Sequence, residues 1–198
     1  MSTPAWLALA ATCSGVVALL VDGRRGAVLA VTVLGAAGGG LASLSGGLAA
    51  FAVVLGPCVL AAVVIELGAR GSGVRSAALG PLLPAPPSEM FGSRALRVAG
   101  GIAALLAARW LAGHVAAGLV VTPVPVFSCA FLWEVGILRA ALARTPQEIG
   151  LGILAAAVAT SAFLLLRGGT EELAVAALAV GAPAGGLILA AIPRRLAR

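Results

Sequence analysis

The sequence predicts an all-α, polytopic membrane protein with seven transmembrane helices, its N-terminus outside and its C-terminus in the cytoplasm. Three observations support this prediction: the composition, the spacing of the apolar runs and the distribution of the arginines. Of the 198 residues, 61% are hydrophobic and 10% are charged, and the mean hydropathy is +1.13. A water-soluble domain of this size exposes too much surface to be so apolar, whereas a lipid-facing surface must be apolar.

The apolar runs are long enough to cross a membrane, which requires roughly 17 to 25 residues per helix. Short polar turns separate the last three runs, so we expect these three to pack as an antiparallel hairpin with a third leg. The fifth run is the weakest candidate because it is short and carries Glu134 and Arg139. The seven predicted spans are 5–21, 27–44, 48–67, 98–121, 126–140, 149–166 and 173–192.

The arginines support the same number of spans. All 13 basic residues are Arg, and only Arg167 follows an even-numbered span. The positive-inside rule places the loops rich in arginine in the cytoplasm, and six or eight spans would scatter these residues to both sides. The arginines at the end of odd-numbered spans or after them are Arg24, Arg25, Arg70, Arg75, Arg94, Arg97, Arg139, Arg144, Arg194, Arg195 and Arg198.

The longest connection between spans contains four prolines, which prevent a continuous helix. We therefore expect an N-terminal three-helix membrane half (1–67), a cytoplasmic proline-containing loop (68–97) and a C-terminal four-helix membrane half (98–198). The sequence shows no convincing internal repeat. The prolines of the loop are Pro81, Pro84, Pro86 and Pro87.

Small residues recur at intervals of four in the second and seventh spans. Such a pattern lets helix backbones approach closely in lipid. Two interpretations remain open: the small faces pack helices within the chain, or they dock a different subunit. The residues are Gly35, Gly39, Ser43 and Gly47 in or just after the second span, and Gly181 and Gly185 in the seventh.

Arg109, His114 and Glu134 lie inside predicted spans and away from the span ends, at membrane depth. An intramembrane charge is expected to face protein or water, and it marks a candidate functional site. We expect Arg109 and Glu134 to form an ion pair because the fourth and fifth spans are antiparallel neighbours. The pair has three interpretations: a structural lock on helix register, part of an ion or proton path with His114, or a ligand contact.

The sequence lacks recognisable catalytic and metal-binding motifs. A single His cannot form an H-E-x-x-H zinc site, and there is no P-loop or dinucleotide fingerprint. No Ser is arranged with the His and an acid in a hydrolase motif. The three Cys lie in separate apolar runs and give no disulfide framework. We expect no catalysis by this chain alone, no metal, no cofactor and no nucleic-acid partner.

The C-terminal block resembles the K subunit of respiratory complex I. The chain is more closely similar to component E of the complex I-related membrane-bound hydrogenases (hydrogenase-4 component E), which also has seven spans and a proline-bearing loop after the third. The matching segments are Gly136-Ile-Leu-Arg139, Ile149-Gly-Leu-Gly-Ile-Leu154, Glu171-Glu-Leu-Ala-Val175, and Gly185-Gly-Leu-Ile-Leu189 followed by Pro193-Arg-Arg195.

This resemblance implies a non-catalytic subunit of a bacterial or archaeal cell (inner) membrane. Such a subunit links larger multi-pass antiporter-like subunits to redox-linked membrane subunits. The family carries carboxylates in the middle of its last two helices, but residues 155–159 and 181–185 contain none here. The implied role is therefore a scaffold without its own proton-relay carboxylates.

Two alternatives to this role remain open. The chain is a stand-alone small transporter if Arg109 and Glu134 line a midplane site. It is a membrane enzyme acting on lipid if the loop 68–97 forms a polar site, although that loop offers only arginines, serines and Glu89.

Overall fold

The computed structural model describes residues 3–21, 24–71, 89–116, 123–143, 146–167 and 172–191. Every regular element in these ranges is an α-helix, which confirms the predicted all-α class for this part of the chain. The loop prolines 81–87 and the arginines at 75, 144, 194, 195 and 198 lie outside the described residues. The helices are α1 (Thr3–Leu20), α2 (Arg24–Gly71), α3 (Glu89–Ala116), α4 (Pro123–Ala141), α5 (Pro146–Leu166) and α6 (Glu172–Ala191).

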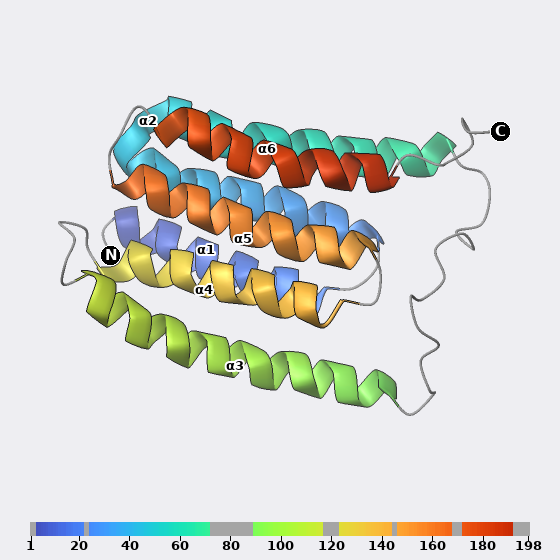
Figure 1. The fold of residues 1–198 in the computed structure, drawn as a ribbon, viewed down its shortest axis with the longest axis horizontal. Coiled ribbons are helices and arrows are strands. Elements are labelled where there is room, and N and C mark those ends of the chain that lie inside the picture. The colour runs from blue at the N-terminus through green and yellow to red at the C-terminus, as the bar shows by residue number, and fades with distance from the viewer. Residues whose placement is uncertain are drawn as a thin grey trace.

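α2 is a helical hairpin and not one straight helix (Figure 1). Gly47 interrupts it with φ 60° and ψ −151°, a backbone conformation that is open almost only to glycine. The two legs then fold back on each other. A Cβ built on Gly35 would lie 2.5 Å from the Cβ of Cys58, and one built on Gly39 would lie 3.0 Å from the carbonyl oxygen of Phe51. The predicted second and third spans are therefore the two legs, and Gly47 forms the turn.

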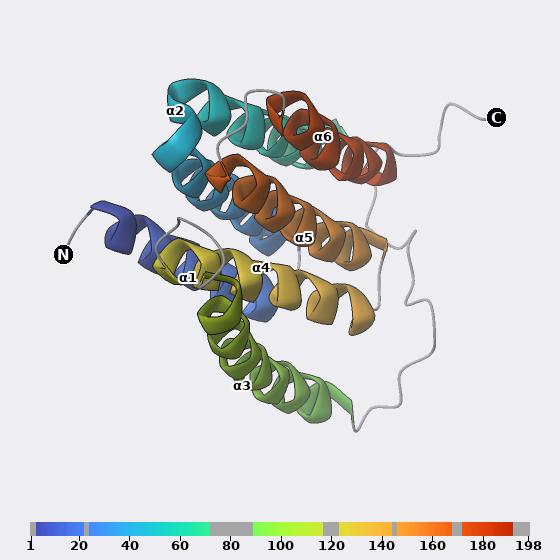
Figure 2. The same ribbon diagram turned by 60° about the vertical axis from the view of Figure 1, so that its left-hand side comes forward.

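The helices form two layers (Figures 1 and 2). One layer contains α3, α4, α5 and α6 in that order. In the other layer, α1 lies against α4, the first leg of α2 lies against α5, and the second leg lies against α6. α3 sits at the edge of its layer, where it packs mainly on α4 and touches α1 only slightly.

Paired helices of the two layers run parallel (Figure 1), and two of the pairs have the same offset along the chain. The hydroxyl of Ser128 on α4 donates to the carbonyl of Ala8 on α1, 120 residues away. The hydroxyl of Ser45 on α2 donates to the carbonyl of Leu165 on α5, also 120 residues away. Two three-helix units of the same order and direction therefore face each other. The sequence shows no convincing internal repeat, so this similarity is visible only in the arrangement of the helices.

α4 and α5 approach until their backbones touch. A Cβ built on Gly136 would lie 2.7 Å from the carbonyl oxygen of Gly152, and one built on Gly152 would lie 2.6 Å from the carbonyl oxygen of Gly136. Neither position accepts a side chain without a backbone shift, as is typical of close helix packing through small residues. Together with α6, these helices form the antiparallel hairpin and third leg that the sequence predicts (Figure 1).

Some helix ends differ from the predicted spans. α4 begins at Pro123 and so extends the short fifth span, because prolines are tolerated in the first helical turn, where the backbone N–H has no partner in the helix. α2 continues to Gly71 and α3 begins at Glu89, so helix occupies both ends of the predicted loop 68–97.

Several of these helices are suited to a membrane. Among the described residues, four helical stretches are long and apolar enough to cross one: Arg25–Leu67, which contains both legs of α2, and Ala95–Val115, Pro123–Ala141 and Glu148–Leu166. Two shorter apolar helices, Pro4–Leu20 and Glu172–Ile188, accompany them. The fold is therefore compatible with a multi-pass membrane protein.

Candidate functional site

The structure does not bring Arg109 and Glu134 together. Arg109 is exposed on α3 and Glu134 is half-buried on α4, and no ion pair joins these two described residues. The register in which α3 packs on α4 explains why these two residues are apart. Gly100 of α3 faces the side chain of Leu138 on α4, so Arg109 comes level with position 129 in the antiparallel pair. That position is about 7 Å along the axis from Glu134 at 1.5 Å per residue. The predicted ion pair does not form.

His114 makes a local contact on α3. Its Nδ1 lies 2.9 Å from the carbonyl oxygen of Trp110, and the two rings have centroids 4.3 Å apart. Both side chains are exposed. Within the described part of the chain, Arg109, His114 and Glu134 therefore do not line a continuous polar path.

Two arginines are buried among the described residues, Arg97 and Arg139, and neither was predicted as a site; the contacts of Arg139 are the clearer. Arg139 is only 4% exposed, and its guanidinium donates to the backbone carbonyls of Ala18, Leu19 and Val21. These carbonyls belong to the end of α1, where no further turn supplies N–H donors. A positive charge at this end also interacts favourably with the helix dipole. Arg139 thus caps α1 from α4, and its place in the last turn of α4 is a sequence signal compatible with such a role.

The polar groups between the helices are engaged by backbone carbonyls. Ser14 donates to Ala11 at 2.7 Å, and Ser161 donates to Ala176 of α6 at 3.3 Å. Among the described residues, no Asp or Glu side chain is buried as a whole, although one carboxylate oxygen of Glu172 is covered, and small apolar side chains dominate the interior. The described interior therefore shows no cluster of polar side chains that would hold an ion or a substrate.

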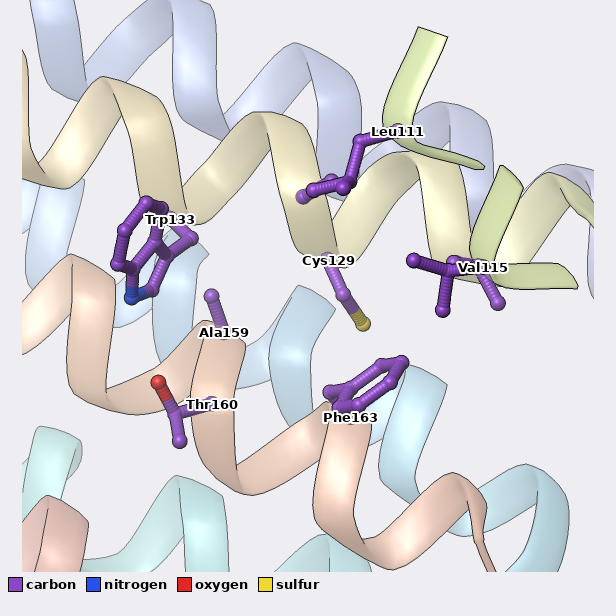
Figure 3. A pocket seen from close by; sticks show the side chains of 9 residues that line it. Leu111, Val115, Cys129, Trp133, Ala159, Thr160 and Phe163 are labelled. Atoms are coloured by element: carbon purple, nitrogen blue, oxygen red, sulfur yellow. The ribbon is translucent and has the colours of Figure 1, made fainter. Parts of the chain in front are cut away.

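An apolar groove of about 260 Å³ opens between α3, α4 and α5 (Figure 3). In Figure 3, Leu111 lies at one side of the groove, and the thiol of Cys129 points toward the ring of Phe163. The hydroxyl of Thr160 already donates to the carbonyl of Ala156 at 2.9 Å. The lining suits a hydrocarbon chain and not a polar ligand. It consists of Leu111, Val115, Val126, Cys129, Ala130, Trp133, Ala159, Thr160 and Phe163.

The small residues singled out in the sequence have four different environments. Gly35 and Gly39 face the second leg of α2, as described above, so they pack helices within the chain. Ser43 donates to the carbonyl of Gly40 in its own helix at 2.7 Å, and Gly47 forms the hairpin turn. Cβ atoms built on Gly181 and Gly185 would meet nothing within 4 Å, so these two glycines leave open space beside α6.

Neither metal ligands nor relatives identify a site. No three His, Cys, Asp or Glu side chains come together in the described ranges. Comparisons with protein families, curated proteins and solved structures found no match for this chain. Any inference about function therefore rests on the positions of the charged and apolar side chains.

Proposed function

We propose that this chain is a seven-span integral membrane subunit that scaffolds a larger assembly in a bacterial or archaeal cell membrane. In this proposal α1, each leg of α2, and α3 to α6 cross the bilayer once, with the N-terminus outside and the C-terminus in the cytoplasm. Each leg of α2 is about 34 Å long at 1.5 Å per residue, which is enough for a ~30 Å hydrocarbon core. The bias of the arginines toward one side supports this orientation.

The outward position of Arg109 and His114 is the observation that carries the proposal. Arg109 and His114 are exposed on α3, while the interior is packed with small apolar residues. A chain that moves an ion by itself needs polar groups along its own interior. A scaffold instead needs its polar and apolar groups on the outside, where other subunits reach them.

The assembly that we propose is a complex I-related hydrogenase or a cation/proton antiporter complex. The chain would link larger antiporter-like subunits to redox-linked membrane subunits. The support is the resemblance of residues 136–195 to the K subunit and component E families. The acids of α5 and α6 are Glu148 and Glu172, and each lies in the first turn of its helix and not at mid-helix. The subunit would therefore contribute no proton-relay carboxylate from these helices.

A stand-alone small transporter is the second candidate, and the parallel pairing of the two three-helix units favours it. Transporters built from parallel repeats place their substrate site near the midplane between the repeats. Here that interface is closed. A Cβ built on Gly38 would overlap Val158, and one built on Gly15 would lie 3.0 Å from the ring of Phe131. The groove of Figure 3 lies elsewhere, between α3, α4 and α5.

Two preparations distinguish these candidates. The tagged chain is purified from its native membranes in a mild detergent, and separately it is reconstituted alone in liposomes. A scaffold co-purifies with large multi-span and iron–sulfur subunits and gives no ion or substrate flux by itself. A chain that purifies alone, and whose flux in liposomes is abolished by Arg109→Ala, is a transporter.

A further inference from the structure

We propose that α1 and α3 together hold one transmembrane helix of a partner subunit, and that this helix carries an Asp or Glu level with Arg109. The inference rests on the proposed function, since it requires the chain to lie in a bilayer beside other subunits. The inference adds the place where the partner subunit docks and the charge that its helix carries. We name the site the α1–α3 corner, formed by Leu9 and Val16 of α1 and by Ile102, Leu105 and Arg109 of α3.

The corner is the place where the two layers do not match. Three of the four helices in the α3–α6 layer are each backed by a helix of the other layer, but α3 is not (Figures 1 and 2). Within the described ranges, no helix therefore occupies the position beside α1 and over α3. One further helix in this position would complete the second layer.

Contacts along α3 show which way Arg109 faces. Gly100 meets Leu138 of α4, and Gly101 meets Leu19 of α1. Successive residues turn by about 100° around a helix, so the next residue, Ile102, faces past α1 and away from α4. Arg109 is seven residues further, or about two turns, and shares the face of Ile102. It therefore lies at the corner and not in the groove between α3, α4 and α5.

Apolar side chains surround Arg109 at the corner. On α3, Ile102 and Leu105 are 59% and 41% exposed, and on α1, Leu9 and Val16 are 47% and 40% exposed. These residues follow the helical spacing that places them on one stripe of each helix. The corner thus combines two apolar stripes with a single guanidinium, a surface that suits an apolar helix carrying one acid.

A carboxylate is the group that this guanidinium requires. Arg109 lies within the apolar stretch Ala95–Val115, and a charge at that depth faces protein or water and not hydrocarbon. The nearest candidate acid in the chain, Glu134, is not paired with it. A carboxylate accepts two parallel hydrogen bonds from the planar guanidinium, which makes it the preferred partner in a dry environment.

Lipid headgroup phosphate is the competing partner for Arg109. Ala116, the last described residue of α3, is seven residues further, about 10 Å along the axis, and the sequence stays apolar to Val121. The headgroups are therefore farther away than an extended arginine side chain reaches. A partner helix is favoured because its acid can lie at the same depth.

The test uses the full tagged chain in its native membranes. A photo-crosslinking amino acid is placed at Ile102, at Leu9 and, as the control, at Leu178, which is 74% exposed on α6. We expect the two corner positions to crosslink to one helix of one partner subunit, with an Asp or Glu within a turn of the crosslink, and Leu178 not to. Crosslinks only to phospholipid, to a second copy of this chain or to a helix without an acid overturn the inference.

A charge exchange tests the pairing itself. We expect Arg109→Glu to lower the amount of that partner in the purified assembly at least tenfold, and the partner's acid exchanged for Arg to restore it. Arg167→Glu, at an exposed turn outside the bilayer, is the matched control and leaves the amount unchanged. If Arg109→Glu leaves the assembly intact, the inference fails and the proposed scaffold stands. If the unaltered chain purifies alone, both fail.

Discussion

The guanidinium of Arg139 on α4 donates a hydrogen bond to the backbone carbonyl of Val21 at the end of α1, with 2.9 Å between Nη2 and the oxygen. The same side chain also donates to the carbonyls of Ala18 and Leu19. One buried charge therefore fastens the C-terminal ends of two parallel helices and satisfies carbonyls that α1 cannot satisfy itself.

Replacing Arg139 by methionine keeps an unbranched, apolar side chain and removes these hydrogen bonds. We expect Arg139→Met to lower the free energy of unfolding by about 2–4 kcal/mol, because each buried carbonyl left without a donor costs about 1–3 kcal/mol. Thermal unfolding in detergent measures the change. Arg167→Met is the control at an exposed position, and equal unfolding temperatures for the two variants would contradict the capping role.

The contact between Gly136 and Gly152 predicts a second pair of variants. Gly136→Val forces the backbones of α4 and α5 apart, and we expect a loss of about 1–3 kcal/mol in stability from overpacking. Gly185→Val is the matched control, since a Cβ there meets nothing within 4 Å. Both variants are compared by thermal unfolding in the same detergent. A loss as large for Gly185→Val as for Gly136→Val would show that close packing of α4 on α5 is not the cause.

The hairpin turn of α2 depends on the absence of a side chain at Gly47. Its φ of 60° with ψ −151° is essentially restricted to glycine, so Gly47→Ala costs about 1–3 kcal/mol. Gly56→Ala is the control, because this glycine lies inside the second leg with open space beside it and alanine favours a helix. We expect the unfolding temperature of Gly47→Ala to be lower, and that of Gly56→Ala to be higher, than that of the unaltered chain. If Gly47→Ala unfolds at the temperature of the unaltered chain, the turn does not need glycine.

The scattered positions of the polar candidates predict that they do not form a proton relay. We expect Glu134→Gln and His114→Ala to leave proton pumping by native membrane vesicles within about twofold of the unaltered level, since a lost relay group lowers a rate by orders of magnitude. Fluorescence quenching of a pH-sensitive dye measures the pumping. A tenfold loss with an intact assembly for either variant would restore the polar path as an interpretation.

The sequence predicts the elements of this fold better than their packing. Apolar length locates the helices, and α5 begins at Pro146, three residues before the predicted span, because proline is favoured at the first helical position. The level at which two helices pack, and the direction in which a residue faces, depend on contacts between distant segments. The register of α3 on α4 places Arg109 level with position 129 and not with Glu134.

The parallel pairing of the two layers was likewise not predictable. It depends on contacts such as Gly38 with Val158, and small apolar residues are so frequent in this chain that many registers look equally suitable. The cap from Arg139 to α1 was not predicted, because an arginine at the end of an apolar run is also typical of the cytoplasmic end of a span. Its partner carbonyls are 118 or more residues away, and no local pattern identifies them.

Accessibility of single cysteines from the two sides of the membrane tests the seven-span arrangement most directly. Arg25→Cys, Arg144→Cys and Arg167→Cys are each introduced into a chain whose native cysteines are replaced by alanine, and intact cells are treated with a membrane-impermeant thiol reagent. The seven-span arrangement predicts that Arg167→Cys is labelled from outside and that the other two are labelled only after the membrane is opened. Labelling of Arg25→Cys and Arg144→Cys from opposite sides would contradict it.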